Sequence, residues 1–141
     1  MIPRLVLMVA AFVAPLCADS EQVVTNVVST LATALSANNP QLFFQAIDRK
    51  MPEYEKFEQA VEALLAQNIV ACTVEVISTG GTDAAPTAEL DWYMVLKSQE
   101  DYNIIERRRT KVTIGLEKQG KKWVVTSFSP LSVFAPMRVK P

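Results

Sequence analysis

The strongest constraint on the fold of this chain is a strand-turn-strand pattern at residues 104–128. Val112, Ile114 and Leu116 alternate with polar residues, and this period of two predicts a half-buried strand. Residues 123–128 are aromatic and β-branched, which favours a partner strand, and Gly120 after Gln119 supplies the positive φ that a tight turn needs. Because a hairpin alone is only marginally stable, the rest of the chain must cover its apolar face.

Three upstream segments carry apolar residues at steps of three and four, which predicts amphipathic helices. Ser20 or Asp19 can cap the first helix, whereas Asn39-Pro40 ends it and begins the second. The third helix follows a break at Pro52. The apolar positions of the three helices are Val24, Val27, Val28, Leu31 and Leu35; Leu42, Phe43, Ala46 and Ile47; and Tyr54, Phe57, Val61, Leu64 and Leu65.

After residue 68 the period changes from helical to alternating, which predicts strands at residues 69–77 and 87–97. Residues 78–86 contain paired glycines and a proline, and we expect a loop there. Helices followed by four strands with short connections indicate the α+β class. We expect N-terminal helices packed on a strongly curved antiparallel sheet of about four strands, a cone-shaped roll.

The N-terminus has the features of a secretory signal peptide. Arg4 precedes an apolar run at residues 5–13, and small residues follow. We predict cleavage after Ala18. Lipidation at Cys17 is disfavoured because Leu16 is bulky, and the apolar run is shorter than the about 20 residues that span a bilayer. The predicted protein is therefore exported, periplasmic or secreted, without stable membrane insertion once the signal is removed.

The length of 141 residues fits one domain, so we predict a signal peptide at 1–18 and a single domain at 19–141. Without Arg4 the 14 basic residues fall to 13, against 15 acidic ones. This balance does not favour nucleic-acid binding. Cys72 is then the one remaining cysteine, which excludes an intrachain disulfide, and its apolar neighbours favour a buried thiol. The chain has no histidine, so we expect no metal site and no cofactor.

The order of elements and several short motifs resemble the nuclear transport factor 2-like superfamily, which includes SnoaL-like cyclases, ketosteroid isomerases and scytalone dehydratase, as a secreted bacterial-type member. The motifs are Asn39-Pro40, Leu90-Asp91-Trp92, Arg107-Arg108, Trp123 after a Gly-Lys turn, and Ser129-Pro130-Leu131. The resemblance implies a cone-shaped α+β fold with a pocket. It does not imply one activity, because this fold hosts enzymes, ligand binders and interaction modules. The absence of histidine departs from the dehydratases of the superfamily, which rely on one.

The candidate chemical groups are Glu106 and Arg108, which share the alternation phase of Val112, Ile114 and Leu116. If the phase holds, Glu106 could act as a catalytic base and Arg108 as an anion-holding group inside a pocket. Alternatively, the strand overruns the helices and both side chains form a solvated ion pair, which is the interpretation that the sequence favours.

The aromatic candidates are Trp92, Trp123 and Tyr54. Trp92 and Trp123 fit the core or a pocket wall better than a sugar platform, and Tyr54 fits either the cone mouth or the core. Asp91 and Tyr93 fall opposite the apolar phase and are expected to face outward.

Three functions remain open. The preferred one is non-catalytic binding of a small apolar ligand or a protein partner. The second is a small-molecule isomerase or cyclase that uses Glu106. The third is a structural module that forms a homodimer through the outer sheet face, around Thr113 and Glu117.

Overall fold

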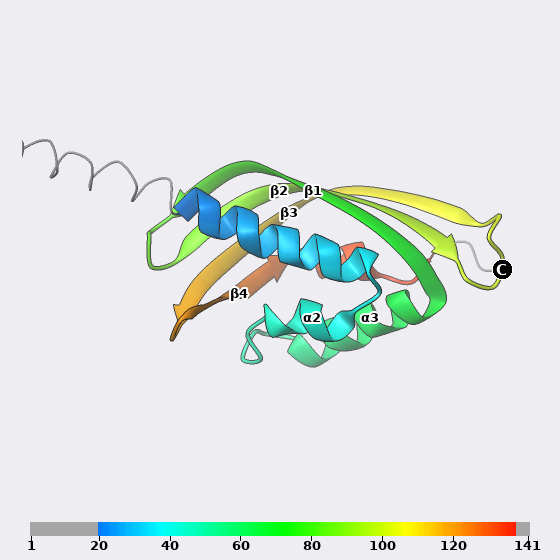
Figure 1. Ribbon diagram of the computed structural model, residues 1–141, viewed down its shortest axis with the longest axis horizontal. Coiled ribbons are helices and arrows are strands. Elements are labelled where there is room, and N and C mark those ends of the chain that lie inside the picture. The colour runs from blue at the N-terminus through cyan, green and yellow to red at the C-terminus, as the bar shows by residue number, and fades with distance from the viewer. Residues whose placement is uncertain (1–19, 138–141) are drawn as a thin grey trace, which may run out of the picture.

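The computed structural model describes residues 20–137 as three helices lying against the inner face of a bent sheet (Figure 1). The N-terminal helix spans residues 20–36. The following elements are α2 (Pro40–Gln45), α3 (Tyr54–Gln67), β1 (Asn68–Gly81), β2 (Pro86–Ser98), β3 (Ile105–Gln119), β4 (Lys122–Ser129) and the 3-10 helix η1 (Leu131–Phe134). The expected signal peptide and its cleavage after Ala18 lie outside the described residues. Among residues 20–137, no helix is long and apolar enough to cross a membrane.

The junction between the N-terminal helix and α2 lies where the sequence predicts. In α2 the Leu42 amide donates to Asn39 Oδ1 at 3.1 Å, and Pro40 occupies the first helical position. Asn38 closes the N-terminal helix with a left-handed φ of 55° and donates its side-chain amide to the Leu65 carbonyl. The predicted apolar stripes of the N-terminal helix and α3 are buried, except that Tyr54 is half-buried. The α2 prediction missed Phe44, which is also buried.

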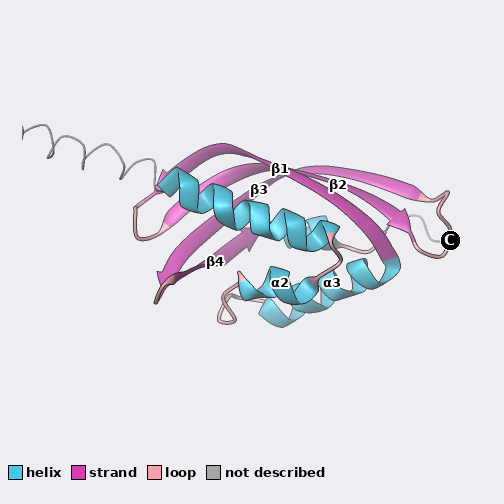
Figure 2. Cartoon of the chain, in the orientation of Figure 1, coloured by secondary structure: helices cyan, strands magenta, loops and turns pink. Residues whose placement is uncertain are grey.

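The four strands form one antiparallel sheet in the order β1-β2-β3-β4, which confirms the predicted α+β class. The sheet bends around the helices (Figure 2). The predicted loop at 78–86 is wrong, because β1 continues to Gly81 and β2 starts at Pro86. A register shift between Val76 and Ser78 breaks the apolar alternation while strand pairing continues.

The hairpin at the C-terminal end of the sheet is as predicted, with β3 and β4 joined at Gly120, whose φ is 65°. Val112, Ile114 and Leu116 are buried on the concave face. A second register shift, beside Gly115, leaves Thr126 without a partner on β3 and bends the sheet. A Cβ at Gly115 would lie 2.6 Å from Ser127 Oγ, so a larger residue here would force the Ser127 side chain to move.

Candidate functional site

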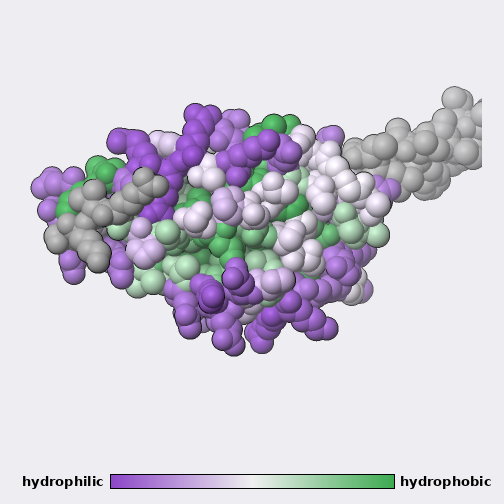
Figure 3. Space-filling view, turned by 180° about the vertical axis from the view of Figure 1, so that it is seen from behind, coloured by the Kyte–Doolittle hydropathy of each residue, from purple (hydrophilic) through white to green (hydrophobic). Residues whose placement is uncertain are grey.

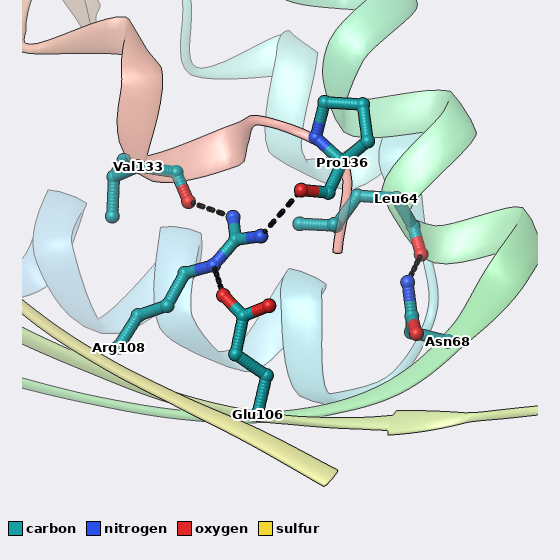
Figure 4. A network of polar contacts seen from close by, with 6 residues as sticks. All are labelled: Leu64, Asn68, Glu106, Arg108, Val133 and Pro136. Atoms are coloured by element: carbon teal, nitrogen blue, oxygen red, sulfur yellow. Dashed lines mark hydrogen bonds and ion pairs between the residues drawn. The ribbon is translucent and has the colours of Figure 1, made fainter. Parts of the chain in front are cut away.

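Glu106 and Arg108 project from β3 toward the C-terminal segment, on the concave side of the sheet (Figure 4). The two side chains form the ion pair that the sequence favours, but they are only 15% and 11% exposed, so the expectation that they lie in solvent is wrong. Arg108 Nε lies 2.5 Å from Glu106 Oε2. The other guanidinium nitrogens donate to backbone carbonyls, Nη1 to Val133 at 2.8 Å and Nη2 to Pro136 at 2.9 Å.

This arrangement makes Arg108 a clamp on the C-terminal segment. Each of its three guanidinium nitrogens has an acceptor within the chain, and the carboxylate of Glu106 fixes the direction of the fork. A groove of about 500 Å³ beside the clamp is lined by the same side chains together with residues of the C-terminal segment. The chemical role of both residues, base and anion-holding group, stays a prediction.

The interior of the cone is filled by aromatic rings from five elements. Phe43, Phe57, Trp92 and Phe134 are at most 1% exposed, and Phe128 is buried beside them. Phe134, which the clamp holds in place, lies 5.4 Å from Phe57 and 5.8 Å from both Phe43 and Trp92, measured between ring centroids. These contacts are edge-to-face or tilted, the arrangements that aromatic quadrupoles favour.

Trp92 carries an unpaired donor within this cluster. Its Nε1 is buried, and no hydrogen-bond acceptor among the described residues reaches it. An unsatisfied buried donor costs about 1–3 kcal/mol. The ring stands nearly perpendicular to Phe128 and Phe134, at 83° and 84°. Trp92 is therefore a core residue with one free N–H for a polar atom that could enter the cone.

The other two aromatic candidates lie apart from Trp92. Trp123 is half-buried in β4 and lines a surface groove of about 340 Å³ with Lys121 and Lys122. Tyr54 packs against Phe44 at 5.6 Å and lines a different groove, of about 620 Å³. Burial, helped by the nearby Glu58 carboxylate, raises the pKa of the Tyr54 hydroxyl. The predicted site residues are thus distributed over separate places.

On the outer face, the expectation for Asp91 and Tyr93 is confirmed: both lie on the side of β2 opposite the buried Trp92. Arg109 donates to both carboxylate oxygens of Asp91, at 3.1 and 2.7 Å. These hydrogen bonds lower the pKa of Asp91 and raise that of Arg109. The three consecutive arginines at 107–109 are split between the two faces, with Arg108 on the inner face.

A further groove was not predicted. It has a volume of about 720 Å³ and lies between the N-terminal helix and β1. Its lining is Thr25, Val28, Ser29, Ala32, Thr33, Ser36, Ala37, Cys72, Thr73, Val74 and Val76. Burial raises the pKa of the Cys72 thiol to about 12, so the thiol is protonated at neutral pH. Among residues 20–137, no group of three or more Cys, Asp or Glu side chains could hold a metal ion.

Sequence reasoning missed the partners of Arg108 and the groove at β1. Val133 and Pro136 lie 25 and 28 positions from Arg108 and offer only backbone carbonyls, which leave no mark on composition or periodicity. The groove did leave one signal. Thr25, Ser29, Thr33 and Ser36 recur at helical spacing as a row of hydroxyls beside the apolar stripe.

No protein-family profile and no curated protein matches the chain. Several solved structures, however, align with the chain. A conserved protein from Planctomyces limnophilus aligns with a TM-score of 0.69 at 9% identity, over 77% of this chain and 91% of that one. A nuclear transport factor 2-like superfamily protein from Salmonella enterica aligns with a TM-score of 0.64 at 11% identity, over 80% and 92%. A nuclear transport factor 2-like protein of unknown function from Shewanella oneidensis gives 0.61 at 10% identity, over 77% and 95%.

The fold is therefore that of nuclear transport factor 2-like proteins, as the sequence resemblance implied. At this level of identity the likeness carries the fold and no activity.

Proposed function

We propose that this chain is a non-catalytic binding module that recognises another protein chain through its surface. The observation that carries the proposal is the filled cone. Phe134 and its aromatic neighbours occupy the space beneath the sheet, and Arg108 holds the segment that bears Phe134. A ligand pocket needs an open concave volume of some hundreds of Å³, and here that volume is occupied by the chain's own rings.

The surface offers features suited to a protein partner. Ile69 and Ile105 are 48% and 44% exposed and flank Lys97 across three strands of the outer sheet face. Lys97 Nζ lies 5.8 Å from the ring of the exposed Tyr102. Seen from behind, apolar and weakly polar side chains cross the middle of the molecule between two hydrophilic borders (Figure 3). An apolar patch with a polar rim is typical of protein interfaces.

Photo-crosslinking tests this proposal. A crosslinking amino acid at Ile105 should capture one discrete partner from an extract of the source cells, and the same residue at Gln59, exposed on α3, should not. The captured protein is then purified and its affinity measured by calorimetry. Ile105→Asp should weaken binding at least about tenfold, which corresponds to about 1.4 kcal/mol. Equal capture at both positions, or an affinity unchanged by Ile105→Asp, would argue against this surface.

The unpaired Trp92 Nε1 favours a second candidate, binding of a small apolar ligand with one acceptor oxygen, after displacement of the C-terminal segment. Titration with a panel of apolar ketones tests it through the NMR signal of the Trp92 indole N–H, assigned with Trp123→Phe. If the protein binds proteins only, the ketones should not shift this signal in the wild type. They should shift it in Phe134→Ala, because that substitution opens a cavity beside Trp92. A saturable shift in the wild type would replace the first proposal with the second.

The isomerase or cyclase alternative would need Glu106 beside a substrate. Glu106 instead lies against Arg108, whose remaining donors point to Val133 and Pro136. Under our proposal the wild type turns over no small-molecule substrate, whereas turnover that is present in the wild type and lost in Glu106→Gln would restore the enzyme.

We also propose export with cleavage after Ala18, on the strength of the N-terminal pattern. The recovered protein should then begin at Asp19. Recovery of soluble protein that begins at Met1 would contradict the proposal.

A further inference from the structure

We propose that the free edge of β1 pairs with the same edge of a second copy of this chain, which gives a two-fold dimer with one continuous sheet. This inference goes beyond the proposed binding function, because it concerns self-assembly at a surface separate from Ile105 and the outer face.

The first step is the backbone of β1. This strand pairs with β2 on one side, and among residues 20–137 no strand pairs with its other side. Amide groups along a strand point alternately to its two sides. The Cys72 amide points away from β2, because it donates to Ser36 Oγ on the N-terminal helix. The amides and carbonyls of Val74 and Val76, two and four residues further on, therefore also point outward from the open edge. An open edge of this kind is a template for another strand.

The second step is the chemistry of the groove beside this edge. None of its lining residues is charged. The three grooves described above at Tyr54, at Trp123 and beside the clamp all carry charges, for example Arg49 and Glu58, Lys121 and Lys122, or Arg107 and Arg109. An uncharged surface can meet its own copy without repulsion between like charges, which a two-fold interface requires because it places each patch opposite itself.

The third step is the register. Glu75 is the one charged residue of β1, and its side chain belongs to the outer face, in the row of Asp91 and Lys111. A two-fold axis at Val74 places Thr73 opposite Glu75 of the second copy and Cys72 opposite its Val76. An axis at Glu75 would oppose two carboxylates, which is destabilising. The axis at Val74 avoids this opposition and centres the pairing on the outward-pointing backbone groups of Val74 and Val76.

In this register the two Val74 residues exchange two backbone hydrogen bonds. Each Val76 amide donates to the Cys72 carbonyl of the other copy, while each Cys72 amide keeps its bond to Ser36. The helix wall of the groove presents the short hydroxyl side chains of Thr25, Ser29 and Thr33, which leave room for the approaching backbone.

Sedimentation of the protein at micromolar concentrations tests the dimer. We expect a monomer-dimer equilibrium in the wild type. Ser29→Glu combined with Thr33→Glu places carboxylates in the groove of both copies and should raise the dissociation constant about tenfold or more. The matched control is Gln59→Glu with Ala63→Glu, the same charges at the same spacing on the exposed side of α3, which should leave the equilibrium unchanged.

Amide hydrogen exchange supplies a readout that does not depend on variants. The Val74 and Val76 amides should exchange more slowly as the protein concentration rises through the dissociation constant. A monomer at every concentration overturns the proposal. So does a dimer that ignores the groove carboxylates while these amides exchange freely, because that dimer uses another face. Capture of a foreign extended peptide by a monomeric chain would likewise assign the edge to a different occupant.

Discussion

The two edges of the sheet are finished in different ways. At the β4 edge, residues 46–48 run alongside the strand. The Asp48 amide donates to the Val125 carbonyl at 2.9 Å, and the Val125 amide donates to Ala46 at 2.7 Å. At the β1 edge, one hydroxyl, Ser36 Oγ, accepts one amide. The chain thus covers the β4 edge with its own backbone and leaves most of the β1 edge open to a neighbour. Whether an edge of this sheet is exposed therefore depends on the short segment that lies beside it.

The largest expected effect concerns the covered edge. Ile47 is 3% exposed and forms the bridge to Val125, so Ile47→Ala should reduce the free energy of unfolding by about 2–5 kcal/mol. Urea denaturation measures this loss. Ile77→Ala on β1 is the control, because Ile77 is 56% exposed and its loss should change stability by no more than about 0.5 kcal/mol. Equal losses would mean that the two edges do not differ in packing.

The next effect concerns the titration of Cys72 beside the open edge. Its pKa is raised from 9.0 to about 12 in the folded state, so the unfolded chain loses the proton first. Stability is therefore complete below pH 9.0 and should fall above it, by roughly 1 kcal/mol per pH unit until the folded pKa is reached. Denaturation of the wild type and of Cys72→Ala across this range measures the difference, and parallel curves would refute the burial of this thiol.

A smaller effect is expected at Ser36. Ser36→Ala removes the acceptor of the Cys72 amide at a partly open site, and should cost about 0.5–1.5 kcal/mol. The same variant should speed exchange of the Cys72 amide without changing that of Val125. If both amides respond, the two edges are coupled rather than independent.

The smallest effect is expected at Asp91, on a central strand between the two edges. Its pKa is lowered by the hydrogen bonds of Arg109, so its contribution is present above the ordinary value of 3.8 and is lost as the pH falls through the lowered value. Asp91→Asn should be slightly less stable than the wild type at neutral pH, and equally stable in acid. A difference that persists in acid would assign the effect to packing instead of charge.

Much of the fold could be predicted from the sequence because its signals are periodic. The helical stripes and the Val112-Ile114-Leu116 face depend on burial against the core, and burial selects apolar residues. The extension of β1 to Gly81 could not be found in this way, since its side chains are exposed there while backbone pairing continues.

The candidate site was less predictable. Alternation placed Glu106 and Arg108 on the inner face, yet their surroundings depend on the backbone carbonyls of residues 133 and 136, which residues of any type would supply. The cover on the β4 edge is likewise made of backbone groups from residues 46–48. Contacts made by backbone groups cannot be predicted from residue types, because nearly every residue carries the same backbone groups.

Phe134 follows every helix and strand whose rings it contacts, and this order has a consequence for synthesis. The ring contacts Phe43, Phe57, Trp92 and Phe128, so the centre of the domain is closed by a side chain that is synthesised after all four of these partners. A nascent chain that still lacks this residue has its helices and strands but no finished interior. The final packing of the domain must therefore wait until residue 134 has emerged from the ribosome, and a product truncated before this residue would keep a gap where the ring belongs.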